Sequence, residues 1–235
     1  EKSKVEELVS RIRLDEELTG GDNDWPTCFE ALDPSSNDSD SDSRHQVLTE
    51  LVEPWLGSVK SLKELKTVDI LLSTLTPERQ RYLDEYYPVF VNAPDGSKVP
   101  VRYVRHDETS HGDDTVGTSC RPLATAKLQQ FFGAQETLRV GPSGTTIPLT
   151  LSLVSPAGKP LAETGDLPFF WKEVYPSIRS EMRGKYPKHP WPEDPLVAIA
   201  TRKTKKQLSN DINLSTTTAE SKRGGKGKKK RKKKK

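Results

Sequence analysis

The residues of this sequence best suited to a chemical task lie in the stretch RSEMRGKYPKHPWPEDP, residues 179–195. Cations and aromatic rings alternate there. Lysine and arginine contact phosphates and aromatic faces stack on bases, so this mixture suits single-stranded RNA. An alternative fits the same residues: the prolines stiffen a strap whose rings fill a groove on neighbouring helices. Both hold together if the rings face inward and the cations outward. The candidate nucleic-acid contacts in this strap are Arg183, Lys185, Tyr186, Lys188, His189 and Trp191.

The second candidate is the basic run at residues 222–235, which holds eleven Lys/Arg and no acid. Since the whole chain has a net charge of +3, the preceding part carries −8. A polycation of this kind binds phosphates with salt-sensitive, sequence-independent affinity, because counterions are released. The same run could also serve as a nuclear import signal or keep the chain soluble. We expect RNA as its partner, through contacts that include Lys228, Lys229, Lys230 and Arg231.

The sequence offers no enzymatic centre. The glycines of GGKGKKK follow no strand and precede no Ser/Thr, so this segment is not a phosphate-binding loop. His106 and His111 lie in a polar insertion without cysteine pairs at metal-binding spacing, which argues against a metal site. No Gly-x-Ser-x-Gly nucleophile elbow is present. We therefore expect no cofactor in this chain and no catalysis by it alone.

Composition and cysteine usage bound the class of protein. A hydrophobic fraction of 32% and a mean hydropathy of −0.74 indicate one modest core with polar tails or linkers. Cys28 and Cys120 are far apart in unlike surroundings, which favours a reducing compartment over a disulfide scaffold. No apolar run reaches the ~18 residues of a membrane span and no signal peptide opens the chain. We expect an intracellular protein of the nucleus, nucleolus or cytoplasm, and interpret a chain starting at Glu1 as a piece of a longer one.

Helices are predicted for the first part of the chain. Residues 1–32 form a helical segment, and the Ser/Asp-rich residues 33–44 form a disordered acidic linker. Residues 45–87 return to helical spacing of apolar side chains. Within them, Thr76 followed by Pro77 is a typical helix start.

A small antiparallel β unit follows. Residues 88–105 read as a hairpin with a Pro-Asp-Gly turn, and residues 145–165 supply further strands. Helices are predicted at 121–132 and at 167–183, the second capped by Asp166 and kinked by Pro176. The predicted fold class is thus α+β over residues 45–200, with a disordered insert at 106–119 and a disordered basic tail at 201–235.

The stretches SVKSLKELKTVDILLSTL, YPVFVNAPDGSKVPVRYV and IPLTLSLVSPAGKPLAETGDLPFFWKEVYPSIRSEMRGKYPKHPWPEDP resemble the C-terminal region of HrpB-type ATP-dependent RNA helicases of the DExH/DEAH class. The resemblance covers roughly residues 45–200. It implies upstream motor lobes that bind ATP and Mg²⁺, and a chain that supports RNA binding and unwinding by them. By analogy with other DEAH helicases, the β unit would be a small oligonucleotide-binding (OB) barrel. The alternative is a free-standing RNA-binding protein that docks on ribosomal or other ribonucleoprotein surfaces through its basic tail.

Overall fold

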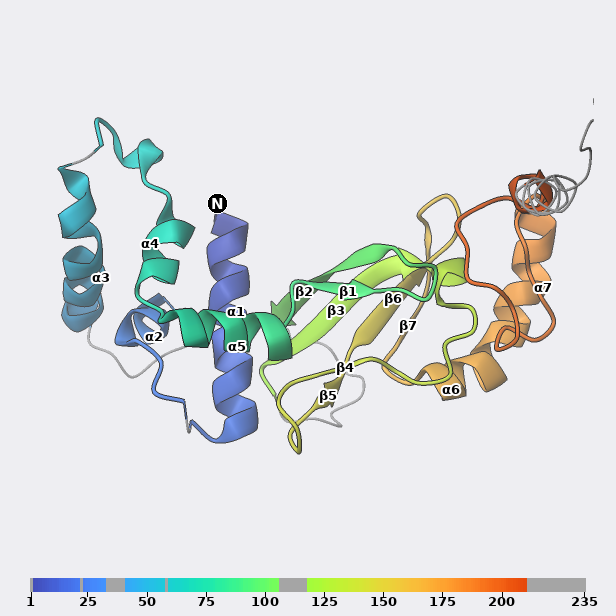
Figure 1. Cartoon of the computed structure of the whole chain (residues 1–235), viewed down its shortest axis with the longest axis horizontal. Coiled ribbons are helices and arrows are strands. Elements are labelled where there is room, and N and C mark those ends of the chain that lie inside the picture. The colour runs from blue at the N-terminus through green and yellow to red at the C-terminus, as the bar shows by residue number, and fades with distance from the viewer. Residues whose placement is uncertain (1, 22, 33–40, 58, 106–117, 211–235) are drawn as a thin grey trace, which may run out of the picture.

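The computed structural model describes residues 2–21, 23–32, 41–57, 59–105 and 118–210. Helices come first, a β-sheet lies in the middle of the elongated molecule, and a second helical part closes the far end (Figure 1). The first part holds α1 (Lys2–Thr19), α2 (Thr27–Leu32), α3 (Ser41–Leu56), the 3₁₀ turn η1 (Leu62–Glu64), α4 (Thr67–Ser73) and α5 (Pro77–Tyr86). The second holds α6 (Leu167–Phe169), the π-helical turn η3 (Phe170–Val174) and α7 (Tyr175–Lys185).

Five strands form the main sheet, in the order β1-β2-β3-β6-β7. Their bounds are β1 (Phe90–Asn92), β2 (Lys98–Arg105), β3 (Cys120–Lys127), β6 (Thr150–Val154) and β7 (Pro160–Thr164). A separate two-stranded hairpin joins β4 (Arg139–Val140) to β5 (Ile147–Pro148), and the 3₁₀ turn η2 (Leu128–Phe131) follows β3. The α+β class predicted from the sequence is therefore confirmed.

The helix caps and the hairpin turn predicted from the sequence are present in the structure. The Thr76 side chain accepts a hydrogen bond from the Arg79 backbone N–H, and Pro77 is the first residue of α5, as predicted. In the β1–β2 hairpin, Gly96 takes a positive φ of 79°, which other residues adopt only under strain. Asp166 accepts a hydrogen bond from the Phe169 N–H and caps α6. Each of these devices acts within four residues, so sequence alone reveals it.

The helix predicted at residues 121–132 is wrong. Residues 120–127 form strand β3, whose side chains alternate between the buried and the more exposed face. The buried set includes Pro122, Ala124 and Ala126, which are too small to stand out in a hydrophobicity pattern. Pairing with β6 begins at Leu123, so the missing N–H of Pro122 falls where β3 has one neighbouring strand. Tertiary pairing thus decided this segment.

The sheet is mixed and open, whereas an antiparallel unit was predicted. Strand β3 runs parallel to β6, and the other neighbours in the sheet run antiparallel. The parallel pairing is possible because residues 128–149 make a long crossover through η2 and the β4–β5 hairpin. Strands β1 and β7 are the two edges, so the described strands close no barrel of the OB type.

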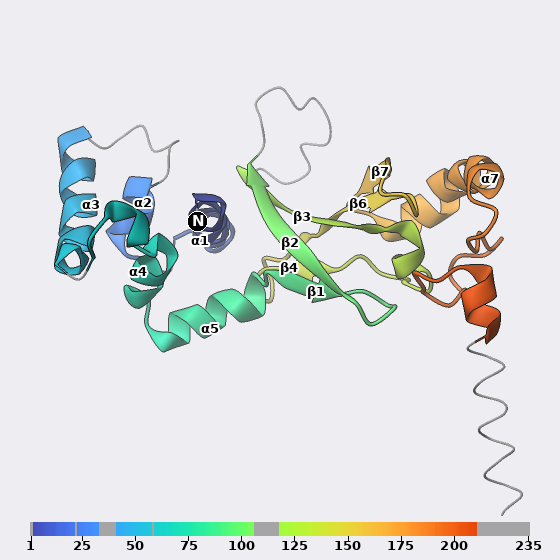
Figure 2. The ribbon, with the colours of Figure 1, turned by 90° about the horizontal axis from the view of Figure 1, so that it is seen from above.

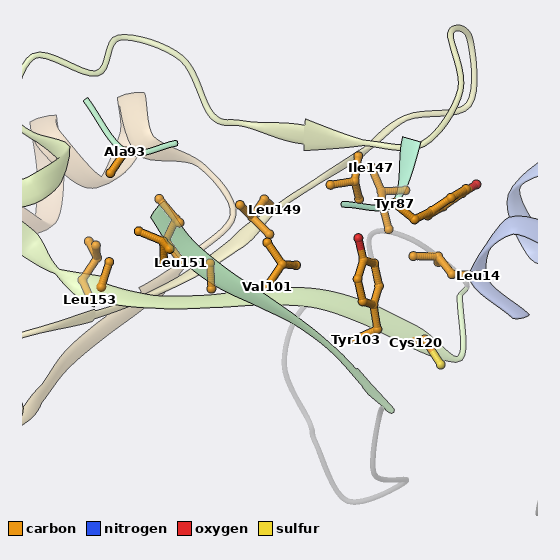
Figure 3. Packing of buried hydrophobic residues seen from close by; sticks show 14 of the residues in the cluster. Leu14, Tyr87, Ala93, Val101, Tyr103, Cys120, Ile147, Leu149, Leu151 and Leu153 are labelled. Carbon is orange, nitrogen blue, oxygen red and sulfur yellow. The ribbon is translucent and has the colours of Figure 1, made fainter. Parts of the chain in front are cut away.

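The core lies on one face of the sheet. Val101, Tyr103, Leu151 and Leu153 are buried there and lie near Leu149 of the crossover (Figure 3). Alternation along each strand places the opposite set of side chains on the other face. That second face is exposed or half-exposed along β2, β3 and β6.

A buried carboxylate joins the first helix to α5. Asp15 of α1 is fully buried, and its Oδ2 accepts hydrogen bonds from Asn23 Nδ2 at 2.7 Å and Trp25 Nε1 at 2.9 Å. Its Oδ1 accepts from the hydroxyl of Tyr82, in α5, at 2.8 Å. Nearby, Arg11 of α1 pairs with Asp84 of α5 at 3.0 Å. These contacts fix the helical part against the segment that leads into the sheet.

The predicted polar segments are only partly within the described residues. Residues 33–40 of the acidic linker, 106–117 of the insert and 211–235 of the tail lie outside them. The remaining linker residues, 41–44, belong to α3. Of the predicted tail, residues 201–210 are described: Thr201 is buried and its N–H donates to the Gln129 carbonyl at 2.9 Å, and most of the residues after it are exposed.

Candidate nucleic-acid interface

The end of α7 and the strap that follows it carry the predicted RNA contacts. Helix α6, the π-helical turn and α7 bury Phe170, Trp171 and Tyr175 against the sheet end of the molecule. The wider π-helical turn lies just before Pro176, which cannot donate a backbone hydrogen bond, so the predicted irregularity occurs there. The helix ends at Lys185, and the Tyr186 N–H donates to the Met182 carbonyl. The strap starts from this fixed point.

The main aromatic ring of the strap faces inward. Trp191 is only 6% exposed, and its Nε1 donates to the Tyr186 carbonyl at 3.1 Å. Tyr175 of α7 donates its hydroxyl to the Pro192 carbonyl at 2.8 Å, and Gln129 of η2 donates to the Pro190 carbonyl at 2.8 Å. Trp191 therefore fills a groove between α7 and η2, and in this arrangement its ring is closed to a base. For Trp191 the structural alternative holds.

Tyr186 and His189 are half-buried. The Tyr186 hydroxyl lies 3.5 Å from Ser155 Oγ, at the β6–β7 turn. Burial, followed by the positive charge of Lys127, lowers the pKa of His189. The imidazole is therefore mainly neutral at neutral pH, and its Nδ1 is buried without a hydrogen-bond partner among the described residues. His189 contributes little charge to the strap.

The cations of the strap face outward. Arg183, Lys185 and Lys188 are all exposed. Lys185 forms an i, i+4 ion pair with Glu181, and the hydrogen bond from this pair raises the pKa of the lysine. The predicted division, with rings inward and cations outward, is thus present, although the sequence did not decide which ring was buried.

The segment that leads to the tail returns to the strap. The Lys205 N–H donates to the Lys188 carbonyl at 2.9 Å, and residues 205–210 form a short helical stretch. Arg202 pairs with Asp95 of the β1–β2 hairpin at 3.1 Å. The backbones of residues 188 and 205 therefore lie side by side, and Lys127 of β3 is near enough to act on His189. Lys127 and Lys205 were missed, because only the fold brings them to the strap.

The remaining candidate contacts, Lys228, Lys229, Lys230 and Arg231, lie outside the described residues. The same holds for His106 and His111. Within the part of the chain that the structure describes, no three His, Cys, Asp or Glu side chains gather as a metal site would require. Cys28 and Cys120 are both buried free thiols. None of the described helices has the length and apolar character of a membrane span.

The chain matches a known protein family over most of its length. Residues 51–195 match the family of ATP-dependent helicase C-terminal regions, HrpB_C. The chain belongs to this family. The match ends at Pro195 and so includes all of the strap.

Full-length relatives extend far beyond this region. The chain is 34% identical over 186 residues to the ATP-dependent RNA helicase HrpB of Escherichia coli K12, covering 78% of the chain and 20% of the relative. A crystal structure of the E. coli DExH-box NTPase HrpB matches with a TM-score of 0.63 and 29% identity, over 86% of this chain and 22% of that one. A crystal structure of the E. coli DEAH/RHA helicase HrpB matches with a TM-score of 0.53 and 28% identity, over 79% and 20%. The chain thus spans about a fifth of the length of the relatives it matches.

Proposed function

We propose that this chain is the C-terminal accessory RNA-binding region of an ATP-dependent RNA helicase. On this proposal, motor lobes elsewhere in the polypeptide bind and hydrolyse ATP with Mg²⁺, and this region holds the RNA that they move. The observation that carries the proposal is a set of exposed cations at the end of α7 and on the strap that follows it, whose backbone is fixed. Arg183, Lys185 and Lys188 are exposed, while Trp191 holds the strap in place from below.

A fixed strap favours phosphate binding for a physical reason. Side-chain hydrogen bonds to its backbone carbonyls hold the strap at Pro190, Trp191 and Pro192, so little backbone entropy is lost when a ligand binds. Each lysine that neutralises a phosphate releases counterions and adds affinity that falls with salt. The basic residues 222–235 would add further phosphate contacts.

The test is binding of a labelled single-stranded RNA by the whole chain, measured by fluorescence anisotropy at a series of salt concentrations. Three proteins are compared with the unaltered chain: one ending at Glu220, a Lys185→Ala/Lys188→Ala variant, and a Lys63→Ala/Lys66→Ala control. The control is matched, because Lys66 pairs with Asp69 as Lys185 pairs with Glu181, and each variant loses two charges.

We expect the strap variant and the tail truncation each to weaken binding and to flatten its salt dependence, by about 1.4 units of slope for the two strap lysines. The control should bind as the unaltered chain does. Equal affinity and slope for all four proteins would refute the RNA-binding role. Loss with the truncation alone would leave the tail as the contact and the strap as structural.

A separate observation tests the link to a helicase. The reading frame upstream of Glu1 should encode a phosphate-binding loop and a DExH box. A frame without them would favour the alternative of a free-standing RNA-binding protein. The compartment stays a prediction, since the matched relative is bacterial and gives no support to a nuclear location.

A further inference from the structure

The face of the sheet opposite the core has a composition of its own. Strand register places Arg102 of β2 opposite Leu123 of β3, and Thr125 of β3 opposite Ser152 of β6. Arg102 and Thr125 are exposed, and Ser152 is half-exposed. We call this surface the outer face; it consists of Lys98, Pro100, Arg102, Val104, Arg121, Leu123, Thr125, Lys127, Thr150, Ser152, Val154 and Glu163.

The outer face is positively charged. It carries the four cations Lys98, Arg102, Arg121 and Lys127. Its acid, Glu163, forms an ion pair with Arg121 at 3.3 Å. At the rim, Glu7 of α1 lies close enough to Arg102 for the two charges to interact. The face therefore carries four cations against one acid of its own, with Glu7 at its rim, and Lys127 lies at the end of β3.

Hydroxyl groups lie between these charges. Thr150 pairs in register with Leu123, and Thr125 with Ser152, so three hydroxyls occupy the middle of the face on β3 and β6. A hydroxyl both donates and accepts, which suits phosphate oxygens and the 2′-OH of RNA equally. From Arg121 to Lys127 the strand runs about 20 Å, a length that several nucleotides can follow.

An aromatic ring lies on the same face at the edge of the sheet. Phe90 of β1 is opposite Pro100 of β2 and is 54% exposed. Exposure of this size is unusual for a phenylalanine in a strand, since burying the ring would be favourable. A base that stacks on the ring would cover it, and stacking of this kind contributes affinity without sequence preference.

The outer face continues into the strap. Lys127 ends β3 and acts on His189, and the Lys205 N–H donates to the carbonyl of Lys188, the residue next to His189. Figures 1 and 2 show that β3 leads toward the α7 end of the molecule, where the strap lies. The cations of the outer face therefore extend along β3 from the middle of the sheet toward the end of α7.

We propose that the outer face binds the backbone of single-stranded RNA, with Arg102 and Lys127 on phosphates, Thr125 and Ser152 on sugar or phosphate oxygens, and Phe90 under a base. The identity of the ligand rests on the function proposed above, but the surface is a separate one. Charge complementarity favours a polyanion. An exposed ring at the edge of the sheet favours a single strand over a duplex, whose bases are already stacked.

The test uses the whole chain and a fluorescein-labelled oligouridylate of twelve nucleotides. An Arg102→Gln/Lys127→Gln variant is compared with a Lys63→Gln/Lys66→Gln control that loses the same charge in the helical part. Glutamine keeps most of the side-chain length, so packing along the strands is retained. Circular dichroism and thermal unfolding confirm that each variant is folded.

Two lost phosphate contacts should weaken binding about 25-fold at about 0.1 M salt, with a slope lower by about 1.4. The control should bind as the unaltered chain does. A second variant, Thr125→Asp, places a negative charge in the middle of the face at an exposed position, and should weaken binding more than the neutral Thr125→Asn does. This second pair keeps the test valid if the double variant does not fold.

The outcomes separate this inference from the proposed function. If the strap variant or the tail truncation loses RNA while Arg102→Gln/Lys127→Gln and Thr125→Asp bind normally, the outer face is not an RNA surface and the proposed function stands. If no variant changes binding, both are wrong. If polyglutamate of equal charge displaces the RNA as well as unlabelled oligouridylate does, the face recognises acidic chains in general, and the inference is overturned in favour of a protein partner.

Discussion

Replacing Asp15 by alanine should destabilise the protein more than the same substitution at any other Asp or Glu of the described helices. The substitution leaves the Trp25 N–H, the Asn23 amide and the Tyr82 hydroxyl without their common acceptor. A hydrogen bond to a charged group contributes about 1.5–3 kcal/mol when its partner is buried. Water can replace part of the loss at Asn23 and Tyr82, which are half-exposed, so we expect a cost of about 3–4 kcal/mol. A domain with a total stability of about 5–15 kcal/mol would lose a large share of it.

Urea unfolding followed by far-UV circular dichroism measures this cost, with two matched variants as controls. Tyr82→Phe removes one of the three hydrogen bonds and should cost about 1–1.5 kcal/mol. Asp84→Asn breaks the neighbouring α1–α5 contact with Arg11, but Asp84 is 73% exposed, so the cost should stay below about 1 kcal/mol. If Asp15→Ala proved no more destabilising than Asp84→Asn, the buried carboxylate would not be the link between α1 and α5.

Three further predictions concern the strap, the crossover and alkaline pH. Trp191→Ala should lower the free energy of unfolding in urea by about 3–5 kcal/mol, because it removes a buried ring under the strap and the hydrogen bond to the Tyr186 carbonyl. Trp191→Phe keeps most of the volume of the ring and should lower it less. Gly133→Ala should lower the melting temperature at a cost of about 1–3 kcal/mol, since Gly133 has a φ of +80° and a Cβ there would lie 3.3 Å from the Ala198 carbonyl oxygen. An unchanged melting temperature would show that the segment at Ala198 can shift. Burial, and after it the hydrogen bond to Asp15, raises the pKa of Tyr82 from an ordinary value of 10 to about 12. The neutral phenol therefore stabilises the folded state below pH 10, and this contribution is lost as the pH rises from 10 to 12. The free energy of unfolding measured across that range should fall less steeply for Tyr82→Phe than for the unaltered chain.

Only some features of the strap can be predicted from the sequence. Its alternation of cations and rings predicts an RNA contact, which stays a prediction, and the family match, which runs through Pro195, includes this segment. Sequence could not say that Trp191 faces inward, because burial depends on the groove between α7 and η2. Nor could it point to Lys127 or Lys205, which stand about sixty and about twenty residues from the strap and reach it only through the sheet and the returning chain.

The sheet also has parts that the sequence predicts and parts that it does not. The hairpin turn at Gly96 and the strand at 150–154 were readable from local sequence, since a turn conformation and a clear alternation of leucines act over a few residues. Strand β3 was mistaken for a helix, because its buried face is built of small residues that gain stability only when strands lie on both sides.

The sequence by itself determined the helix starts, the turns, the absence of a phosphate-binding loop and the family, all of which depend on residues close together in the chain. Tertiary structure alone decided the parallel pairing of β3 with β6, the Asp15 contacts and the approach of Lys127 to His189. The physical reason is the range of the forces involved. Caps and turns are satisfied by hydrogen bonds within four residues, whereas burial, strand pairing and charge proximity depend on which distant segments the folded chain brings into contact.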